Sequence, residues 1–228
     1  MLIPREEYLS SGCHIGLIYK TKDMKRFIYK IRPNGLSVLN LSMLDERIHN
    51  AASMLSKAKK VLVVSRKEGG HKAIIAFARA IGAIAMKGRF MPGSLTNPTY
   101  KAFFEPDILF TVDTASDRQA IGEATQMRIP IIALADTFSS TSYIDLIIPC
   151  NNKSKNSIGL ILFLLAREIN NLQGKQFSAK LEDFTPPKEE GRETVMDENV
   201  ESTEKPEELI EQEKRKEAKM KKRDKTKE

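Results

Sequence analysis

The sequence predicts an α/β domain with a parallel sheet, because short apolar runs alternate with helical patterns along most of its length. Between Leu36 and Leu172, runs rich in β-branched residues are separated by segments whose apolar residues recur every three or four positions. Several runs are apolar at consecutive residues, which is typical of strands buried on both faces. The predicted strands are Leu36–Leu41, Val61–Val64, Ala83–Met86, Ile108–Val112, Ile131–Leu134 and Leu146–Ile148.

The helices between these strands are predicted from their start signals. Ser42 with Asp45 resembles a capping box, and Ser116 with Gln119 forms a second one. A further helix is expected to open at Gly70, and the last one begins in the range 153–157. Each predicted helix carries its apolar residues on one face, so we interpret these stripes as core.

Charge is divided unevenly along the chain. The 228 residues hold 37 Lys and Arg and 30 Asp and Glu, a net charge of +7. Residues 1–175 carry 24 basic and 14 acidic side chains, a net charge of +10, whereas residues 176–228 carry 13 and 16. The folded part is therefore predicted to be the basic part, which favours a polyanionic partner.

Composition predicts three parts. Residues 1–35 form a basic N-terminal segment packed on the main domain, and residues 36–184 form the α/β domain. Residues 185–228 are expected to be a charged, largely disordered tail, because 13 acids face 3 bases in residues 182–213 and 9 bases face 3 acids in residues 214–228. Such a tail suggests an alternative role, an independent adaptor that uses the tail to recruit partners.

Two stretches interrupt the βα alternation and are candidates for function. Cys13–Pro33 gathers Lys and Arg beside aromatic residues, and Gly88–Pro106 is predicted to be one long ordered loop with three Pro and two Gly. Loops of this length inside a compact domain tend to be functional.

A glycine-containing turn offers the most plausible enzymatic feature. Gly69 and Gly70 lie between a predicted strand and helix, where many α/β proteins bind phosphate, but neither G-x-G-x-x-G nor the Walker pattern fits. A glycine pair also suits any tight strand-to-helix turn. The alternative of a phosphorylated-small-molecule-binding protein or enzyme using the Gly69–Gly70 turn therefore stays open.

Other reactive side chains favour structural roles. Asp113 and Asp136 each follow a strand at its carboxyl end and could act as paired carboxylates, but each precedes Thr at a turn, where Asp bonds nearby amides. The histidines and the two cysteines, Cys13 and Cys150, show no metal-ligand spacing, and we expect buried reduced thiols. No catalytic residue, metal or cofactor is predicted.

Nothing in the sequence predicts a targeting or membrane segment. Pro4, Arg5 and two Glu stand where a signal peptide would need an apolar region. The longest apolar run, Ile158–Ala166, is far shorter than the roughly 20 residues of a membrane span. We therefore expect a cytoplasmic protein with no membrane contact.

Particular motifs then point to a family. Between Leu9 and about Arg167 the sequence contains, in this order, Gly12–Gly16, Met24–Ile28, Arg32–Gly35, Gly88–Asn97, Pro106–Asp107, Ala120–Ala124, Ile129–Thr137 and Ile148–Asn152. With these motifs in the family's order, it resembles the universal second protein of the small ribosomal subunit.

The resemblance implies a three-layer α/β domain with a mainly parallel five-stranded, flavodoxin-like sheet. Bacterial members insert a long helical hairpin, but residues 40–61 have room for one helix, so the archaeal branch fits best. The tail lacks the aromatic repeats of the animal laminin-receptor branch. A structural protein is implied, near the head–body junction, that contacts small-subunit ribosomal RNA and neighbouring ribosomal proteins without catalysis or functional homo-oligomers.

Carried over by position, the resemblance makes the basic residues of three segments the RNA-facing candidates. The competing interpretation for each is a solvated basic face or a loop packed on its own domain. Phe90 belongs to the same candidate loop, while Asp113, Glu123 and Asp136 become structural or protein-facing residues. The candidates are Lys20, Lys22, Lys25, Arg26, Lys30, Arg32, Arg89, Lys101, Lys153 and Lys155.

Overall fold

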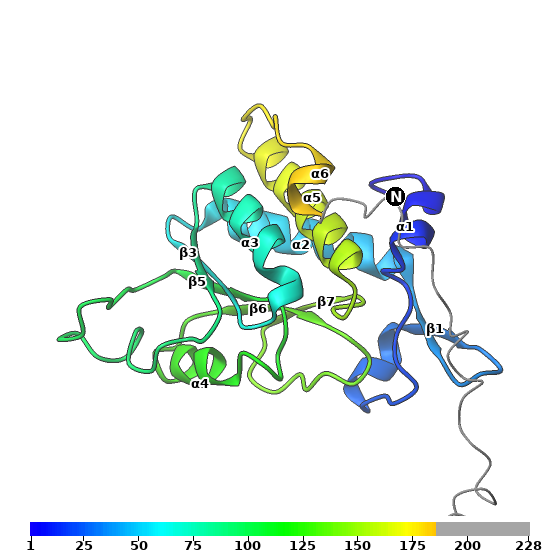
Figure 1. Cartoon of the computed structure of the whole chain (residues 1–228), viewed down its shortest axis with the longest axis horizontal. Coiled ribbons are helices and arrows are strands. Elements are labelled where there is room, and N and C mark those ends of the chain that lie inside the picture. The colour runs from blue at the N-terminus through cyan, green and yellow to red at the C-terminus, as the bar shows by residue number, and fades with distance from the viewer. Residues whose placement is uncertain (186–228) are drawn as a thin grey trace, which may run out of the picture. The chain divides into compact units, whose positions relative to one another are not determined.

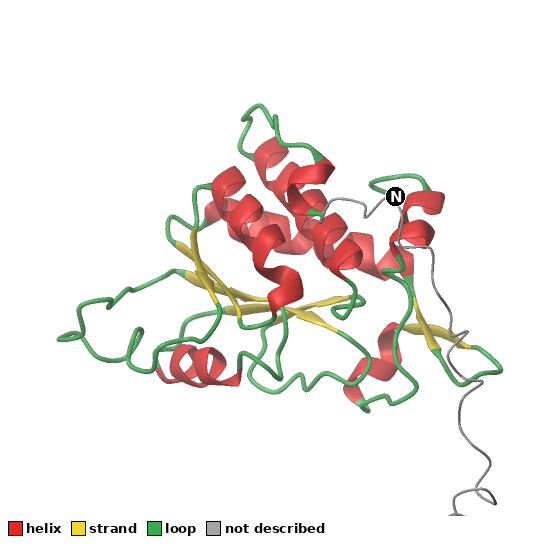
Figure 2. Ribbon diagram, viewed as in Figure 1, coloured by secondary structure: helices red, strands yellow, loops and turns green. Residues whose placement is uncertain are grey.

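The structure is a computed structural model that describes residues 1–185. Helices and strands alternate along most of this range (Figures 1 and 2). In chain order the elements are α1 (Arg5–Ser11), the 3-10 helix η1 (Asp23–Phe27), β1 (Ile28–Ile31), β2 (Ser37–Leu39), α2 (Leu41–Lys57), β3 (Val61–Ser65), α3 (Glu68–Ile81), β4 (Ile84–Lys87), β5 (Ile108–Thr111), α4 (Arg118–Gln126), β6 (Ile131–Ala135), β7 (Leu146–Pro149), α5 (Lys155–Leu172) and α6 (Leu181–Phe184).

Five parallel strands form the central sheet, in the order β4-β3-β5-β6-β7. Val63 on β3 pairs with Ala85 on one side and Phe110 on the other. Counted from β3, this is the strand order 2-1-3-4-5 of flavodoxin-like proteins. Helices α2, α3 and α5 lie on one face and α4 lies on the other (Figure 2), which confirms the predicted three-layer fold class.

Side-chain alternation along the strands explains why the sheet needs helices on both faces. On β3, Val61 and Val63 belong to the apolar cluster that contains residues of α2, α3 and α5, whereas Leu62 and Val64 join the cluster that contains residues of α4. β5 divides its side chains in the same way. Consecutive apolar residues in a strand therefore indicate two cores, one on each face of the sheet.

The basic N-terminal part contains a strand pair that the sequence did not predict correctly. β1 was missed, because it is only four residues long, is mostly exposed and lies in a stretch that its cations marked as a basic segment. The prediction that Leu36–Leu41 belongs to the parallel sheet is wrong, since β2 pairs antiparallel with β1 in a separate two-stranded sheet. The boundary expected between residues 35 and 36 falls inside the turn of this hairpin.

Two predicted helix caps are also wrong. Asn40 caps α2 by accepting the Ser42 N–H at 3.0 Å, and the Asp45 carboxylate instead accepts the Tyr8 hydroxyl. At α4 the Ser116 hydroxyl donates to Asp113 at 2.9 Å, so it caps nothing. α3 begins at Glu68, two residues before the predicted start. α5 begins at Lys155, within the predicted range.

Most of the predicted tail lies outside the described residues. Within residues 1–185, no helix combines the length and apolar character that crossing a membrane requires. The last described helix, α6, packs on α3 and α5 through Phe184, which is 1% exposed. The Phe184 ring meets the Phe163 ring edge to face, with centroids 5.7 Å apart.

Replacing this ring tests whether α6 is part of the core. We expect Phe184→Ala to lower the free energy of unfolding by about 3 to 5 kcal/mol, because it removes a buried aromatic ring and leaves a cavity. Chemical denaturation followed by circular dichroism measures the change. The matched control Leu181→Ala, on the same helix but 37% exposed, should cost under about 1 kcal/mol. Equal effects would contradict the packing described here.

Candidate nucleic-acid interface

The N-terminal segment presents its cations on a short ribbon at one end of the molecule (Figure 1). We call η1 with the β1–β2 hairpin the basic ribbon. Lys25 and Arg26 lie in the last turn of η1, Lys30 lies on β1, and Arg32 begins the hairpin turn, in which its N–H donates to the Leu36 carbonyl at 2.9 Å. All four of these side chains are exposed.

The root of the basic ribbon is buried although its cations are not. Met24 and Phe27 of η1 pack with Leu39, Ala135 and Ile147 in a third apolar cluster. Residues 14–17 lie along β2, where the Gly16 N–H donates to the Ser37 carbonyl at 2.8 Å and the Leu39 N–H donates to His14. The sheet domain therefore fixes the position of the ribbon.

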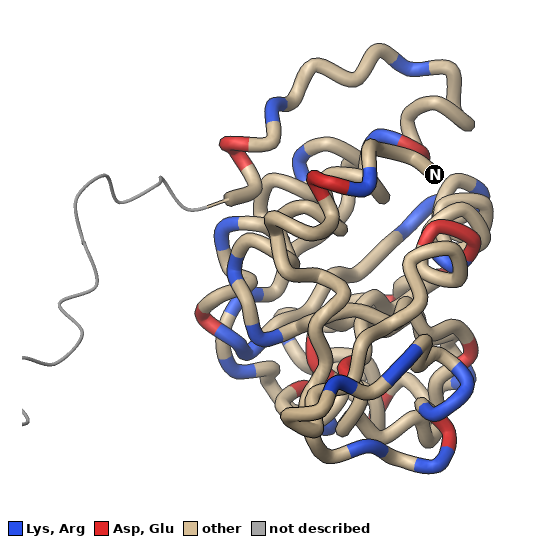
Figure 3. Tube along the Cα trace, turned by 90° about the vertical axis from the view of Figure 1, so that its right-hand side faces the viewer, with Lys and Arg blue, Asp and Glu red and all other residues tan. Residues whose placement is uncertain are grey.

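The ten predicted RNA-facing cations share one property. Within residues 1–185, none of them forms an ion pair with a carboxylate. Nine are exposed and Lys20 is half-buried. Figure 3 shows Lys and Arg recurring along the trace on the side that carries the N-terminal segment. Unpaired exposed cations are available to neutralise phosphates.

Arg26 differs from its neighbours because it also has a packing role. Its guanidinium carbon lies 4.7 Å from the centroid of the Phe27 ring, a cation–π contact, and Arg47 approaches the same ring at 5.5 Å. Removing Arg26 would therefore disturb the ribbon as well as its charge.

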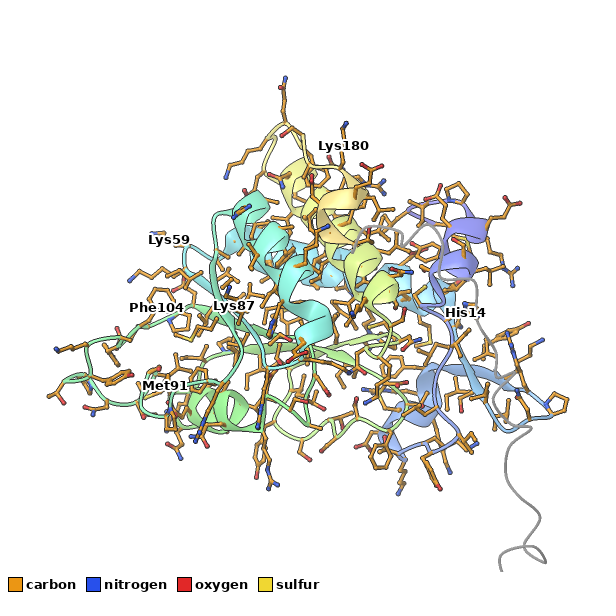
Figure 4. The ribbon with its side chains drawn as sticks, viewed as in Figure 1. His14, Lys59, Lys87, Met91, Phe104 and Lys180 are labelled. Carbon is orange, nitrogen blue, oxygen red and sulfur yellow. The ribbon has the colours of Figure 1, made fainter. Side chains whose placement is uncertain are left out.

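The loop of residues 88–106 lies at the opposite end of the domain from the basic ribbon. Met91 and Phe104, which belong to this loop, are far from His14 in Figure 4. Arg89 and Lys101 are exposed, but Phe90 is buried in the cluster beneath α4, so its prediction as an RNA-facing residue is wrong. The structure does not bring the two predicted basic groups together.

Glu123 on α4 holds this loop in place. Its carboxylate accepts the Gly93 N–H at 2.8 Å and the Leu95 N–H at 3.2 Å, and the Gln119 side chain donates to it at 2.9 Å. Glu123 is buried. The resemblance assigned it a structural or protein-facing role, and the structure shows that the role is to anchor the loop.

Lys153 and Lys155 lie at the N-terminus of α5. Ser154 caps this helix without a side-chain hydrogen bond, and the Asn151 side chain accepts the Lys153 N–H at 2.9 Å. Both lysine side chains are exposed. The two cations are thus placed where the helix dipole already favours an anion.

At the carboxyl edge of the sheet, hydrogen bonds bridge the position at which proteins of this topology bind ligands. That position is the crevice between β3 and β5, from which the chain leaves toward opposite faces. Asp117 bridges it, because its carboxylate accepts the Arg66 N–H at 2.8 Å and the Thr111 hydroxyl at 2.6 Å. Burial raises the pKa of Asp117. No local sequence pattern marks Asp117 for this role, because its partner Arg66 lies 51 positions away in the chain.

Lys67 crosslinks the same edge. Its ammonium group donates to the Asn152 carbonyl at 2.6 Å and lies 3.6 Å from the Asp113 carboxylate. Burial lowers the pKa of Lys67, and the charge of Asp113 opposes that shift. Loops that follow β3, β5 and β7 are therefore tied to one another.

The glycine turn that was an alternative phosphate site, and the two aspartates Asp113 and Asp136, make contacts within the domain. A Cβ added at Gly70 would lie 3.2 Å from the Ser65 hydroxyl oxygen, so close packing of α3 on β3 favours glycine there. Asp113 accepts the Ser116 hydroxyl, and Asp136 accepts the Thr137 N–H at 2.6 Å. Each aspartate accepts a hydrogen bond from its own loop, which fits the structural role that the sequence favoured for both.

The histidines and the two cysteines were predicted to show no metal-ligand spacing. Among the described residues, no group of three or more His, Cys, Asp or Glu side chains is placed to hold a metal ion. Cys13 and Cys150 are both buried and unpaired, as predicted. Burial raises the pKa of the Cys13 thiol to about 11.

A comparison with protein families decides the identity. The family model described as Ribosomal protein S2 matches residues 8–103 and 99–171, which is more than half of the chain. The chain belongs to the ribosomal protein S2 family. It is therefore a structural protein of the small ribosomal subunit, where the family binds ribosomal RNA and other ribosomal proteins. The residues matched to the S2 family include the basic ribbon, the long loop and the closed edge of the sheet.

Glu123 offers a test of how the S2 loop is held. We expect Glu123→Ala to destabilise the protein by about 2 to 4 kcal/mol, because two loop amides lose their acceptor in a buried place. Hydrogen exchange should become faster at the amides of Gly93 and Leu95. Glu105→Ala, which removes an exposed carboxylate from the same loop, is the matched control and should leave this exchange unchanged.

His14 predicts a pH dependence of stability. Burial lowers the pKa of His14 below its ordinary value of 6.5, so the folded protein binds this proton more weakly than the unfolded chain does. The stabilisation is present above pH 6.5 and is lost as the pH falls.

The measurement is denaturant unfolding between pH 7 and pH 5. The His14→Gln variant should lose part of the slope, at most about 1.4 kcal/mol per pH unit. The exposed His49 is the control, and His49→Gln should keep the slope. An unchanged slope in His14→Gln would contradict the assignment.

Proposed function

We propose that this S2 protein binds small-subunit ribosomal RNA chiefly through its N-terminal segment, from Lys20 to Arg32. One observation carries the proposal: six cations within thirteen residues lie on a positioned segment, and none is paired with a carboxylate among the described residues. Among the described residues only Lys67 and Arg167 form side-chain ion pairs, so the density of cations on a fixed support is what sets this segment apart. Phosphates of RNA supply the missing counter-charge.

The other candidate cations are proposed to contact different elements of the subunit. Arg89 and Lys101 belong to the loop of residues 88–106, whose Met91 and Phe104 lie far from His14 in Figure 4. They would therefore reach another RNA segment or a neighbouring ribosomal protein. Lys153 and Lys155 would hold a phosphate at the start of α5.

The proposed setting follows the resemblance and is cytoplasmic, near the head–body junction of the subunit. The archaeal-type branch is supported by α2, the one helix between Asn40 and Val61, where bacterial members insert a helical hairpin. The charged tail, residues 185–228, is proposed from its composition alone to contact neighbouring molecules.

The proposed function includes no catalysis. The crevice in which flavodoxin-like proteins place their ligands is bridged by Asp117 and crosslinked by Lys67. Gly70 faces Ser65 and Val112 instead of an open cradle. These contacts disfavour the phosphorylated-small-molecule alternative.

Removing three ribbon cations tests the RNA contact. In the variant Lys25→Ala, Lys30→Ala, Arg32→Ala, affinity for small-subunit ribosomal RNA should fall, and its dependence on salt should flatten by about one unit for each lost phosphate contact. Arg26 is kept, because it also packs on Phe27. Filter binding at several salt concentrations measures both quantities.

The matched control removes the same charge elsewhere. Lys57→Ala, Lys59→Ala, Lys60→Ala changes three exposed lysines, and Lys59 lies away from His14 and the ribbon in Figure 4. This variant should keep most of its affinity. Equal losses in the two variants would show general electrostatic attraction, and assembly of the ribbon variant into subunits at the normal level would show that another face binds RNA.

A further inference from the structure

Two exposed aromatic rings lie together beside the basic ribbon. Tyr19 precedes η1 and is 74% exposed, whereas Phe138 follows β6 and is 62% exposed. The ring centroids are 6.2 Å apart and the planes are inclined by 62°, an edge-to-face pair. Single exposed apolar side chains are ordinary, but a pair brought together from distant parts of the chain needs a reason.

The backbone that carries these rings is held firmly. Thr137 is buried, its hydroxyl donates to the Tyr19 carbonyl at 3.1 Å, and the Leu17 N–H donates to that hydroxyl at 2.9 Å. The Thr21 N–H donates to the Thr137 carbonyl at 2.9 Å. A Cβ at Gly16 would lie 2.4 Å from the Thr137 methyl carbon, so only glycine permits this approach. The rings are therefore exposed on a fixed support.

The geometry leaves aromatic faces open. In an edge-to-face pair, one ring touches the other only through its edge, so its own faces remain uncovered by the partner. Two cations lie close by in the sequence: Lys20 follows Tyr19 directly and is half-buried, and Lys22 comes three positions after Tyr19 and is exposed. The nearby carboxylate of Asp23 accepts the Thr141 hydroxyl at 2.7 Å, which ties the two segments together again.

We propose that Tyr19 and Phe138 form a stacking site for an unpaired base of ribosomal RNA, with Lys20 and Lys22 on the phosphates of the same strand. Aromatic rings beside cations are how proteins bind single-stranded RNA without reading its sequence. Cores of protein interfaces are larger and depleted of lysine, whereas this site consists of two rings next to Lys20. The inference deepens the proposed function and rests on it.

Binding of the full chain to a labelled single-stranded adenylate octamer, followed by fluorescence anisotropy, tests the site. Leucine keeps apolar bulk but has no aromatic face, so Tyr19→Leu and Phe138→Leu should each weaken binding by about 5- to 150-fold. Tyr19→Phe should bind as tightly as the unchanged chain. The control Tyr143→Leu changes a ring that is 73% exposed and has no aromatic neighbour among the described residues, and it should have no effect.

The variants separate failure of this inference from failure of the proposed function. If the ribbon variant Lys25→Ala, Lys30→Ala, Arg32→Ala weakens binding while both leucine variants bind normally, base stacking is overturned and RNA binding by the ribbon stands. If all three variants bind normally, both proposals fail.

A cross-link in assembled small subunits identifies what the rings touch. With the substitution Phe138→p-azidophenylalanine, irradiation should attach a nucleotide at this position, found by mass spectrometry after nuclease and protease digestion. An adduct with another ribosomal protein and none with RNA would assign the pair to a protein contact and overturn the inference.

Discussion

Burial of the parallel sheet on both faces is the constraint on which the rest of this structure depends. Apolar side chains of β3 and β5 point alternately into two clusters, and β6 contributes to both, so neither face can carry polar chemistry. Polar groups are confined to the ends of the strands and to the loops. Every candidate for function in this S2 protein consequently lies at an edge of the sheet or outside it.

The protein treats its two kinds of charge differently. At the carboxyl edge, Asp117 is buried and Lys67 is half-buried, and both are satisfied by backbone and side-chain partners, so they hold loops together. On the basic ribbon, the cations are exposed and unpaired with carboxylates in the described part of the chain. Internal pairing removes a charge from binding, whereas an exposed unpaired cation keeps its full capacity for phosphate. This division explains how a flavodoxin-like fold can serve in a ribonucleoprotein.

The N-terminal segment joins the domain through backbone hydrogen bonds as well as through apolar contacts. Residues 14–17 pair with β2, and Thr137 in the loop after β6 binds the segment again at Leu17, Tyr19 and Thr21. This support requires the Thr137 hydroxyl and glycine at position 16, but it makes no use of the side chains of Tyr19 or of the ribbon cations. The ribbon and the exposed ring pair can thus vary in residue type while their support stays in place.

The sequence by itself determined the parallel sheet, most of its strands, the core faces of the helices and the family. These features depend on local periodicity and on short sequence motifs. It missed β1, because this four-residue strand is exposed and lies among cations. It misplaced the caps of α2 and α4, because several polar residues near each start can compete for the same amides. The tertiary structure decided which cations share a surface. It separated the loop of Arg89 from the basic ribbon, buried Phe90, and brought Tyr19 to Phe138. Contacts between residues over a hundred positions apart are set by how strands are ordered and loops are anchored, and no local pattern encodes that.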